Sequence, residues 1–339
     1  MKSNPTILLV VVLLLACGGT AATTTTPTSV ADEGTVVLYS GRTEELVGPL
    51  LTRFEEEAGI DVDVRYGSSP EMAATILTEG TDSPADLFYS QDPASLGSVA
   101  DLMELLPESI LSLAPERFSD PDGRWVGITA RSRVLAFNPE LVAEADLPAT
   151  YRELVDPQWS GRFGIAPTNG SFVTFVSAMI LLEGEEATGE WLEGIAANDP
   201  VTFDGNSPIA AAVDAGDLEL GLINHYYLRE LAAEQGSITA QNHFFTEPDA
   251  GSLVMPSGIG ILSTSSNPVA AEDLIEFLLS AESQAYFAET NFEYPVSPDA
   301  PAPGGLPAID TLVSPVLSSA ELAGVLDQAT DLIAAAGLA

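Results

Sequence analysis

The sequence predicts an α/β protein in which helices cover both faces of a parallel β-sheet. Three observations support this fold class. Short apolar segments alternate with segments of helical apolar spacing, the same alternation returns in the middle of the chain, and no internal repeat or heptad pattern indicates another architecture. The chain has 339 residues, 46% of them hydrophobic, which is enough for one large core or two of ordinary size.

The first predicted elements follow a β-α-β-α-β order. In chain order they are a strand at 35–39, a helix at 44–58, a strand at 60–66, a helix that ends at Leu77 and a strand at 84–89. Gly59 ends the first helix, and Ser68 with Pro70 begins the second. This order favours a parallel sheet, because each helix returns the chain to the same end of the sheet.

The rest of the chain repeats the pattern. Strands are predicted at 125–138, 161–165, 218–223 and 251–262, and helices begin near 169–171 and 206–208 or span 271–279 and 321–336. The predicted strand at 218–223 is apolar and ends abruptly in the polar segment Asn224-His225-Tyr226-Tyr227. Ligands of α/β sheets bind beyond the carboxyl ends of strands, so the segments 40–43, 67–70, 90–92 and 224–227 are candidate site residues.

Charge and composition exclude several functions. Asp and Glu number 50 against 11 Lys and Arg, a formal net charge of −39, so the general field of the protein repels nucleic acid and anionic membrane surfaces. This charge attracts cations, and it also fits a saline habitat. One cysteine and two histidines argue against disulfide frameworks, zinc clusters and Cys/His catalysis. A surface hydrolase is disfavoured as well, since no G-x-S-x-G segment occurs and no enzyme activity is expected.

The N-terminus predicts export. Residues 1–16 read as a signal peptide, with Lys2 before an apolar run that is too short to span a membrane. Cys17 follows Leu14-Leu15-Ala16, which resembles a bacterial lipobox, so Cys17 is the expected site of lipidation. The alternative is a cysteine that happens to end an apolar stretch. Residues 17–34 are rich in Thr, Ala and Pro and suit a tether.

The two adjacent tyrosines allow two interpretations. Tyr226 and Tyr227 either plug the end of the strand with their rings, or both reach one ion if the chain leaves strand geometry there. A phenol loses its proton to a metal only when the ion is highly charged, and ferric iron best meets that requirement.

Several segments, in order, resemble the ferric-ion-binding proteins of bacterial ABC importers, which have the type II periplasmic-binding-protein fold. The matching segments are VLYSGR (37–42), PADLFY (84–89), WVG (125–127), RSRV (131–134), PTNGSF (167–172), NHYY (224–227) and EYP (293–295). The resemblance runs from about residue 35 to the end. It implies a two-lobe α/β solute-binding protein that binds Fe³⁺ with a synergistic phosphate or carbonate.

The resemblance also implies site residues. Tyr226 and Tyr227 match the iron ligands, and the positions that hold the anion match Asn169, Gly170, Ser171, Asn206 and Asn224. Asn169 and Asn206 are equally plausible as plain helix caps.

The chain departs from the family's full ligand sets. Some members have a histidine where this chain has Thr43 and a glutamate where it has Gln91, and others have a third tyrosine where it has Asn169. Asp92 is the nearest carboxylate that could replace these ligands, or else it is a helix cap. Glu44 is the next candidate ligand. Arg42 and Arg131 either balance the anion or form ion pairs at the surface or between lobes.

The implied organisation has two lobes and two hinge crossovers. One lobe is expected over 35–130 plus 252–300, and the other over 131–251 plus 301–339, with crossovers near 128–136 and 250–260. The expected partners are an ABC permease, ferric iron or a ferric chelate, and a lipid anchor, with the protein a monomer at the outer face of the cytoplasmic membrane or in the periplasm. The alternative is a protein of the same fold that binds another solute, such as an inorganic anion, a polyamine, thiamine or a sugar acid.

Overall fold

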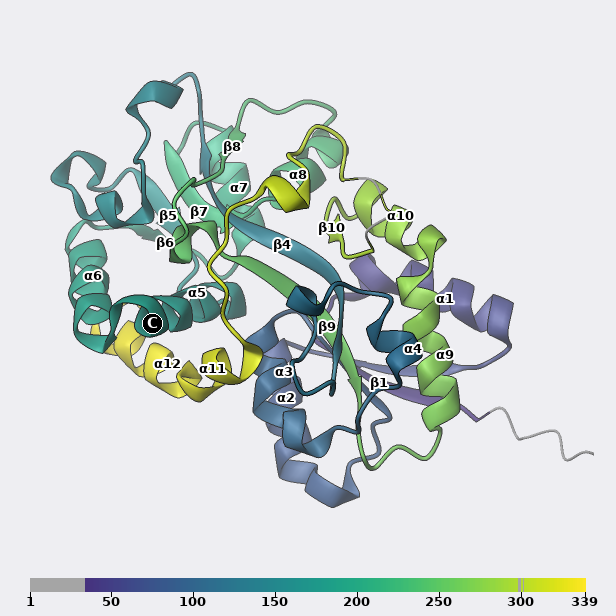
Figure 1. Ribbon diagram of the computed structural model, residues 1–339. Coiled ribbons are helices and arrows are strands. Elements are labelled where there is room, and N and C mark those ends of the chain that lie inside the picture. The colour runs from purple at the N-terminus through teal and green to yellow at the C-terminus, as the bar shows by residue number, and fades with distance from the viewer. Residues whose placement is uncertain (1–33, 298–299, 301) are drawn as a thin grey trace, which may run out of the picture. The chain divides into compact units, whose positions relative to one another are not determined.

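The computed structural model describes residues 34–297, 300 and 302–339 (Figure 1). The predicted signal peptide, Cys17 and all but the last residue of the predicted tether lie outside the described residues. In the part described, helices cover a mixed sheet with the strand order β2-β1-β3-β9-β4-β7-β5-β6, and β8 and β10 also pair with β4. The α/β prediction is confirmed.

The first half of the sheet follows the predicted β-α-β-α-β order. Its elements are β1 (Val36–Ser40), α1 (Glu44–Ala58), β2 (Val62–Tyr66), α2 (Ser69–Glu79), β3 (Leu87–Ser90), α3 (Pro93–Val99) and the short α4 (Glu108–Leu111). β1 lies between β2 and β3, and both pairs are parallel. Ser68 caps α2 by accepting a hydrogen bond from the Glu71 N–H, and Pro70 lies in the first turn, as predicted.

The second half of the sheet has its own set of helices. Its elements are β5 (Phe163–Ile165), α5 (Gly170–Glu183), α6 (Glu185–Ala197), β6 (Val201–Thr202), α7 (Asn206–Asp214), β7 (Leu220–Asn224), α8 (Tyr227–Gln235) and β8 (Gln241–His243). The chain then returns to the first half through β9 (Val254–Ile261), α9 (Pro268–Leu279), α10 (Ala281–Glu289) and β10 (Tyr294–Pro295). The predicted parallel pairing is confirmed for β1, β2 and β3, but β9 runs antiparallel to β3, so the sheet as a whole is mixed.

One long strand, β4 (Val126–Phe137), belongs to both halves of the sheet. Val126 to Ser132 pair with β9, whereas Arg133 to Phe137 pair with β7, so the partner changes between Ser132 and Arg133. In Figure 1, β4 and β9 run through the middle of the fold between the two groups of helices. The change of partner falls inside 128–136, where a crossover is predicted.

The hydrophobic core is divided in the same way. One large cluster packs α1 and α9 against β1, β3 and β9, with Val47, Phe54 and Leu274 fully or almost fully buried. The other packs α5 and α6 against β5 and β7, with Phe175 and Leu192 fully buried. Each half therefore buries an apolar face of its own.

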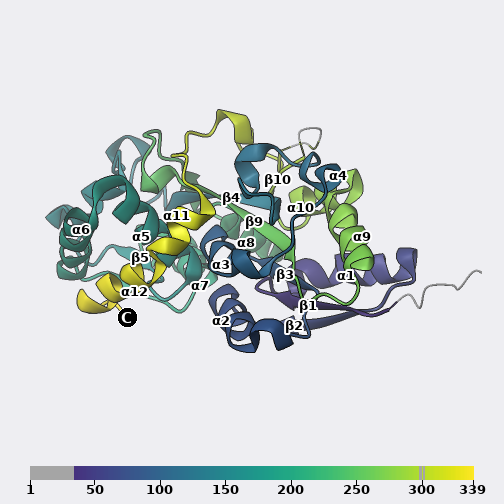
Figure 2. The ribbon, with the colours of Figure 1, turned by 60° about the horizontal axis from the view of Figure 1, so that its bottom comes forward.

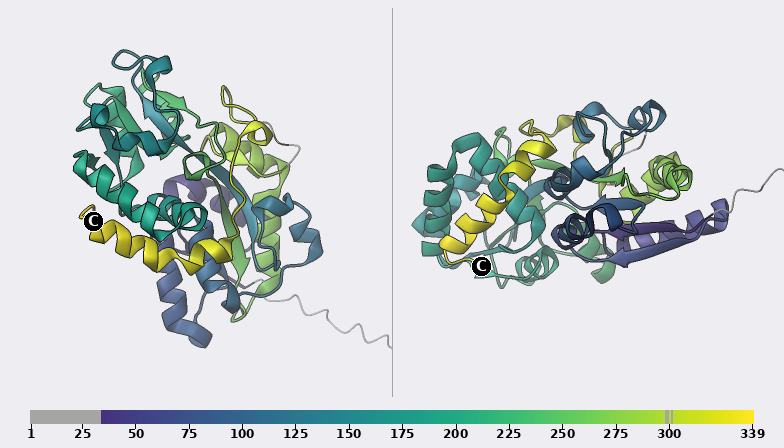
Figure 3. Two further views of the ribbon diagram at one scale, coloured as in Figure 1. Left: turned by 60° about the vertical axis from the view of Figure 1, so that its left-hand side comes forward. Right: turned by 90° about the horizontal axis from the view of Figure 1, so that it is seen from below.

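The C-terminal segment differs from its prediction. The single helix predicted over 321–336 is two helices, α11 (Ser319–Gly324) and α12 (Leu326–Ala335), separated at Val325, whose φ of −120° is not helical. α11 packs against both α3 and α5, and α12 packs against α5 and α6. Figures 2 and 3 show these two yellow helices alongside α5.

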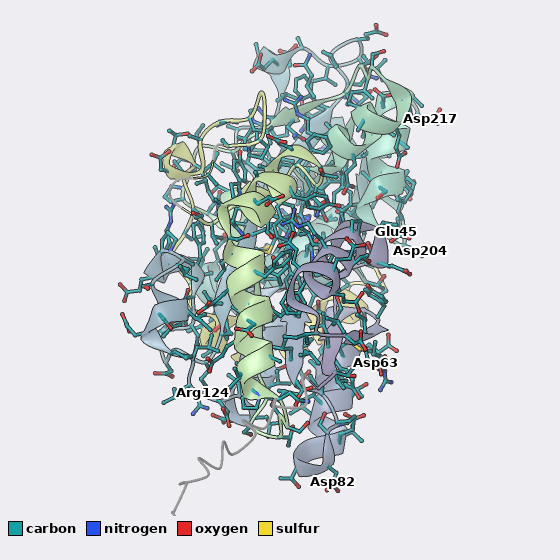
Figure 4. All side chains as sticks on the ribbon, turned by 90° about the vertical axis from the view of Figure 1, so that its right-hand side faces the viewer. Glu45, Asp63, Asp82, Arg124, Asp204 and Asp217 are labelled. Carbon is teal, nitrogen blue, oxygen red and sulfur yellow. The ribbon has the colours of Figure 1, made fainter. Side chains whose placement is uncertain are left out.

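Most of the acidic charge is at the surface. Exposed carboxylates project from separate elements, and the labelled Glu45, Asp63, Asp82, Asp204 and Asp217 in Figure 4 are examples. Among the described residues, no helix is both long and apolar enough to cross a bilayer.

Gly97 lets α11 approach α3 closely. A Cβ at Gly97 would lie 2.5 Å from the Ser319 carbonyl oxygen, whereas a Cβ at Gly189 of α6 would meet nothing nearer than a Leu332 methyl at 3.7 Å. We therefore expect Gly97→Ala to lower the free energy of unfolding by about 1–3 kcal/mol, because a backbone must shift. The control Gly189→Ala should raise it by up to about 1 kcal/mol. Denaturant titration measures both, and an unchanged or raised value for Gly97→Ala would contradict the close packing.

Candidate functional site

The tyrosine pair lies where β7 turns into α8. β7 ends at Asn224, and Tyr226 already has helical angles (φ −77°, ψ −23°), so the chain leaves strand geometry there. The two rings stack with centroids 4.2 Å apart and an interplanar angle of 29°. Adjacent Cα atoms are about 3.8 Å apart, and the ring centroids are nearly as close, so the two side chains run side by side. Tyr226 is buried and Tyr227 is half-buried.

Charged groups from the other half of the sheet lie near this pair. Arg42 follows β1, and its Nη2 donates to Glu293 Oε2 at 2.6 Å. Arg131 of β4 lies with its Nη1 3.6 Å from Glu293 Oε1, so one carboxylate serves two guanidinium groups. All three side chains are at most 1% exposed, so these are buried ion pairs rather than surface ones.

The arginines oppose the effect of burial on Tyr226. Burial is the largest influence and raises the pKa of Tyr226 well above its ordinary value, and neighbouring Tyr227 raises it further. Arg42 and Arg131 act in the opposite direction, because their positive charges stabilise a phenolate. Tyr226 therefore keeps its proton at neutral pH.

The site holds more buried hydrogen-bond donors than acceptors. Six buried nitrogens of this site have no hydrogen-bond acceptor among the described residues, namely Nε and Nη1 of Arg42, Nε and Nη1 of Arg131, Nε of Arg133, and Nδ2 of Asn224. Buried donors without partners are rare in folded proteins. An anion with several oxygen atoms would satisfy them, so the donor set fits an anion.

The start of α5 forms a connected polar network. Asn169 caps the helix, and its Oδ1 accepts from the N–H and hydroxyl of Ser171 at 3.1 and 2.6 Å. Arg133 Nη1 donates to Asn224 Oδ1 at 3.1 Å and to Ser171 Oγ at 3.4 Å. The positive end of the helix dipole at Gly170 adds to the attraction for an anion.

Asn206 belongs to the same network and is not a helix cap. The N-cap of α7 is Gly205, and the side chain of Asn206 is buried and donates instead to Asn169 Oδ1 at 3.3 Å. The cap interpretation is thus confirmed for Asn169 and wrong for Asn206. Both side chains face the start of α5, where an anion site is predicted.

Asp92 approaches this network from α3. It caps α3, with Oδ1 accepting from the Ser95 N–H at 2.7 Å and Oδ2 from the Ser95 hydroxyl at 3.0 Å. Burial raises its pKa, and the bonds from Ser95 lower it. A Cβ at Gly170 would lie 3.7 Å from Asp92 Oδ2, and a cavity of about 250 Å³ borders both residues. The cap role is thus observed, and the role of metal ligand stays a prediction.

Of the positions where this chain departs from the family, Asn169 belongs to this network, whereas Thr43 and Gln91 make none of these contacts. Thr43 and Glu44 are exposed, and Gln91 is half-buried with its backbone N–H donating to Ser69 Oγ. Among the described residues, no cluster of three or more His, Cys, Asp or Glu side chains could hold a metal.

Three residues were not predicted from the sequence as site residues. Arg133 and Glu293 are fully buried charges, and each stands in one of the segments that carried the family resemblance. The sequence signal that could have identified Arg133 as a site residue is a charged side chain within an otherwise apolar predicted strand. Tyr89, at the end of β3, is buried with its hydroxyl unpartnered among the described residues, and burial raises its pKa to about 12.

His225 uses both ring nitrogens within the protein. Its Nδ1 accepts from the Ser132 N–H at 3.1 Å, and its Nε2 lies 3.0 Å from the Phe292 carbonyl oxygen, to which it donates. Burial lowers the pKa of His225 to about 3, so the imidazole is neutral.

Comparisons with known proteins agree with this arrangement. Residues 82–309 match the family described as bacterial extracellular solute-binding protein. The chain is 33% identical to the Fe(3+)-binding periplasmic protein of Serratia marcescens over 86% of this chain and 87% of the relative.

Solved structures show the same fold. Iron-bound HitA from Pseudomonas aeruginosa matches with a TM-score of 0.85 and 35% identity, over 90% of this chain and 99% of that one. The Trichodesmium protein FutA, in complex with iron and citrate, matches with a TM-score of 0.77 and 25% identity over 90% and 100%. These likenesses confirm the predicted two-lobe fold.

Glu293 should be essential to the stability of the arginine cluster. Glu293→Gln removes the carboxylate shared by Arg42 and Arg131, and breaking a buried pair in this way costs about 3–5 kcal/mol. Glu282→Gln is the control, because Glu282 pairs with Arg53 at the surface and should contribute less than about 1 kcal/mol. Chemical denaturation compares the two, and similar small losses would show that Glu293 does not hold the cluster together.

Proposed function

Because the chain belongs to the family of bacterial extracellular solute-binding proteins, we propose that it captures Fe³⁺ between its two lobes and delivers it to the permease of an ABC importer. The names of its relatives support iron as the cargo, since the Serratia marcescens protein is called Fe(3+)-binding and the HitA structure is iron-bound.

The stacked pair of tyrosines carries the proposal. The side chains of Tyr226 and Tyr227 run side by side with stacked rings, and we propose that both hydroxyl oxygens bind one ion. Phenolate is a hard oxygen donor, and a trivalent cation offsets the free energy needed to remove two phenolic protons. A divalent ion of the same size attracts the two phenolate oxygens less strongly, so it offsets less of the free energy needed to remove their protons. This pair therefore favours Fe³⁺.

The charge around the pair requires an anion as well. With both phenolates bound, a trivalent ion remains positive, and Arg42, Arg131 and Arg133 add three buried positive charges against the two buried carboxylates of Glu293 and Asp92. Burying such an excess is unfavourable unless a counterion is present. We propose that a synergistic phosphate or carbonate fills this role, and the citrate in the Trichodesmium complex suggests that a carboxylate can replace it.

The anion would lie between the helix start and the arginines. Its proposed contacts are Asn169, Gly170, Ser171, Asn206, Asn224, Arg42, Arg131 and Arg133. The support is the helix N-terminus together with the six buried donors that have no protein acceptor among the described residues. Asp92 is kept as the proposed first-lobe metal ligand, through lone pairs not used by Ser95.

Closure of the lobes would complete the site. We assign 35–130 plus 252–300 to one lobe and 131–251 plus 301–339 to the other, with hinges near 128–136 and 250–260. The change of strand partner after Ser132 supports the first hinge, because a strand that pairs in both halves can bend between them. Binding would shift the population towards the closed form, which the permease recognises.

Export with a lipid anchor is part of the proposal. Cleavage after Ala16 would expose Cys17 for acylation and hold the binding lobes at the outer face of the cytoplasmic membrane through the threonine-rich tether. A monomer satisfies this role, since each chain contains both lobes.

The double variant Tyr226→Phe/Tyr227→Phe tests the ferric assignment. We expect it to lose the visible absorption of tyrosinate–iron and ferric binding, while the melting temperature of the metal-free protein changes by only a few degrees. Titration with ferric citrate, followed by visible absorption, measures this. Tyr286→Phe is the control, because Tyr286 is a half-buried tyrosine on α10, and this variant should bind ferric iron like the wild type. A colourless wild type that binds an organic solute would favour the alternative cargo instead.

Asn224→Asp tests the anion. The change keeps the acceptor for Arg133 but replaces the free Nδ2 donor with a negative oxygen, so it should repel an anion. Phosphate or bicarbonate should raise the ferric affinity of the wild type by at least about tenfold, equivalent to about 1.4 kcal/mol, and that of the variant hardly at all. Gln235→Glu adds the same charge at the exposed end of α8 and should respond like the wild type. An equal response of all three proteins would rule out this anion site.

A further inference from the structure

We infer that His225 is a positioning residue that fixes the tyrosine pair relative to the Arg42–Glu293–Arg131 cluster; this inference rests on the proposed function. His225 precedes Tyr226 directly and is fully buried. It binds no ion itself, because both of its ring nitrogens are used by the protein.

The first connection is to the residue where β4 changes partner. The His225 N–H donates to the Ser132 carbonyl at 3.0 Å, and the Ser132 N–H donates to His225 Nδ1 at 3.1 Å. Both backbone groups of Ser132 are thus held by one residue. Ser132 is the last residue of β4 that pairs with β9, so the two hydrogen bonds of His225 hold the strand at the proposed hinge.

The second connection is to the segment that carries the arginine cluster. Nε2 of His225 donates to the Phe292 carbonyl at 3.0 Å, and the imidazole lies against the Tyr294 ring with centroids 4.6 Å apart. Between these two residues is Glu293, whose carboxylate holds Arg42 and Arg131. Phe292 has a φ of +56°, which is rare for a residue other than glycine and must be stabilised by its surroundings.

The third connection is to the tyrosines themselves. The His225 ring meets the Tyr226 ring edge-on, with centroids 5.8 Å apart and an interplanar angle of 79°. The His225 carbonyl accepts from Asn242 Nδ2 at 2.6 Å, which holds the backbone just before Tyr226. With its ring and its backbone both fixed, His225 sets the direction in which the next two side chains leave the chain.

These connections differ from those of an ordinary buried histidine. A residue that only fills the core would affect folding, whereas His225 joins the hinge, the arginine cluster and the phenols through separate atoms. Changing it should therefore alter the geometry of the ferric site as well as stability. The position of the tyrosinate–iron absorption band reports that geometry directly.

His225→Ala, His225→Asn and His225→Gln separate the connections. Asn keeps an acceptor close to Nδ1 for Ser132, and Gln keeps a donor that reaches towards Phe292 as Nε2 does. The matched control is His243→Asn, since His243 is half-buried on β8 and packs on Phe245. Each full-length protein is titrated with ferric citrate in phosphate, and we record the ferric affinity, the visible band and the melting temperature without iron.

We expect the ferric affinity of His225→Ala and His225→Asn to fall at least about tenfold, with a shifted band, as for the loss of a buried hydrogen bond. His225→Gln should recover part of the lost affinity and part of the band shift. His243→Asn should match the wild type in both measurements. Wild-type affinity and band in the Asn and Gln variants would overturn the inference, even if the Ala variant fails to fold. A wild type that shows no band would instead overturn the ferric function, and this inference with it.

Discussion

The burial of three guanidinium groups beside two phenols is the constraint on which the site depends. Among the described residues, Glu293 is the carboxylate that forms ion pairs with Arg42 and Arg131, and Arg133 has no carboxylate partner. Such an excess is tolerated where it stabilises negative charge that arrives later. Under the proposed function, phenolates formed on metal binding and a small anion would supply that charge together, and the uptake of cation and anion would depend on each other.

The fold places these groups from distant parts of the sequence. Arg42 comes from the end of β1, Arg131 and Arg133 from the strand shared by both halves of the sheet, and the tyrosines from the turn after β7. The arginines of β4 straddle the point where its partner changes. The buried arginines of β4 and the proposed hinge therefore occupy the same few residues, and we expect filling of the proposed site to act on that hinge.

The sequence predicted the fold and the tyrosine site better than the charge around it. Alternating apolar segments predicted the order of β1 to β3, and a polar segment after an apolar strand predicted where the chain leaves β7 at Tyr226 and Tyr227. The partners of Glu293 could not be predicted, because Arg42 and Glu293 are 251 residues apart and only the folded chain brings them together. The contact of Asn206 could not be predicted either. The local sequence favours a helix cap at Asn206, but in the folded chain its side chain donates to Asn169 Oδ1.

A crystal structure of the protein loaded with ferric iron and phosphate, with anomalous scattering recorded at the iron edge, tests the central claim most directly. We expect one iron atom bonded to the hydroxyl oxygens of both Tyr226 and Tyr227, with phosphate oxygens facing the start of α5. Iron bonded to neither hydroxyl, or to only one of them, would contradict the account.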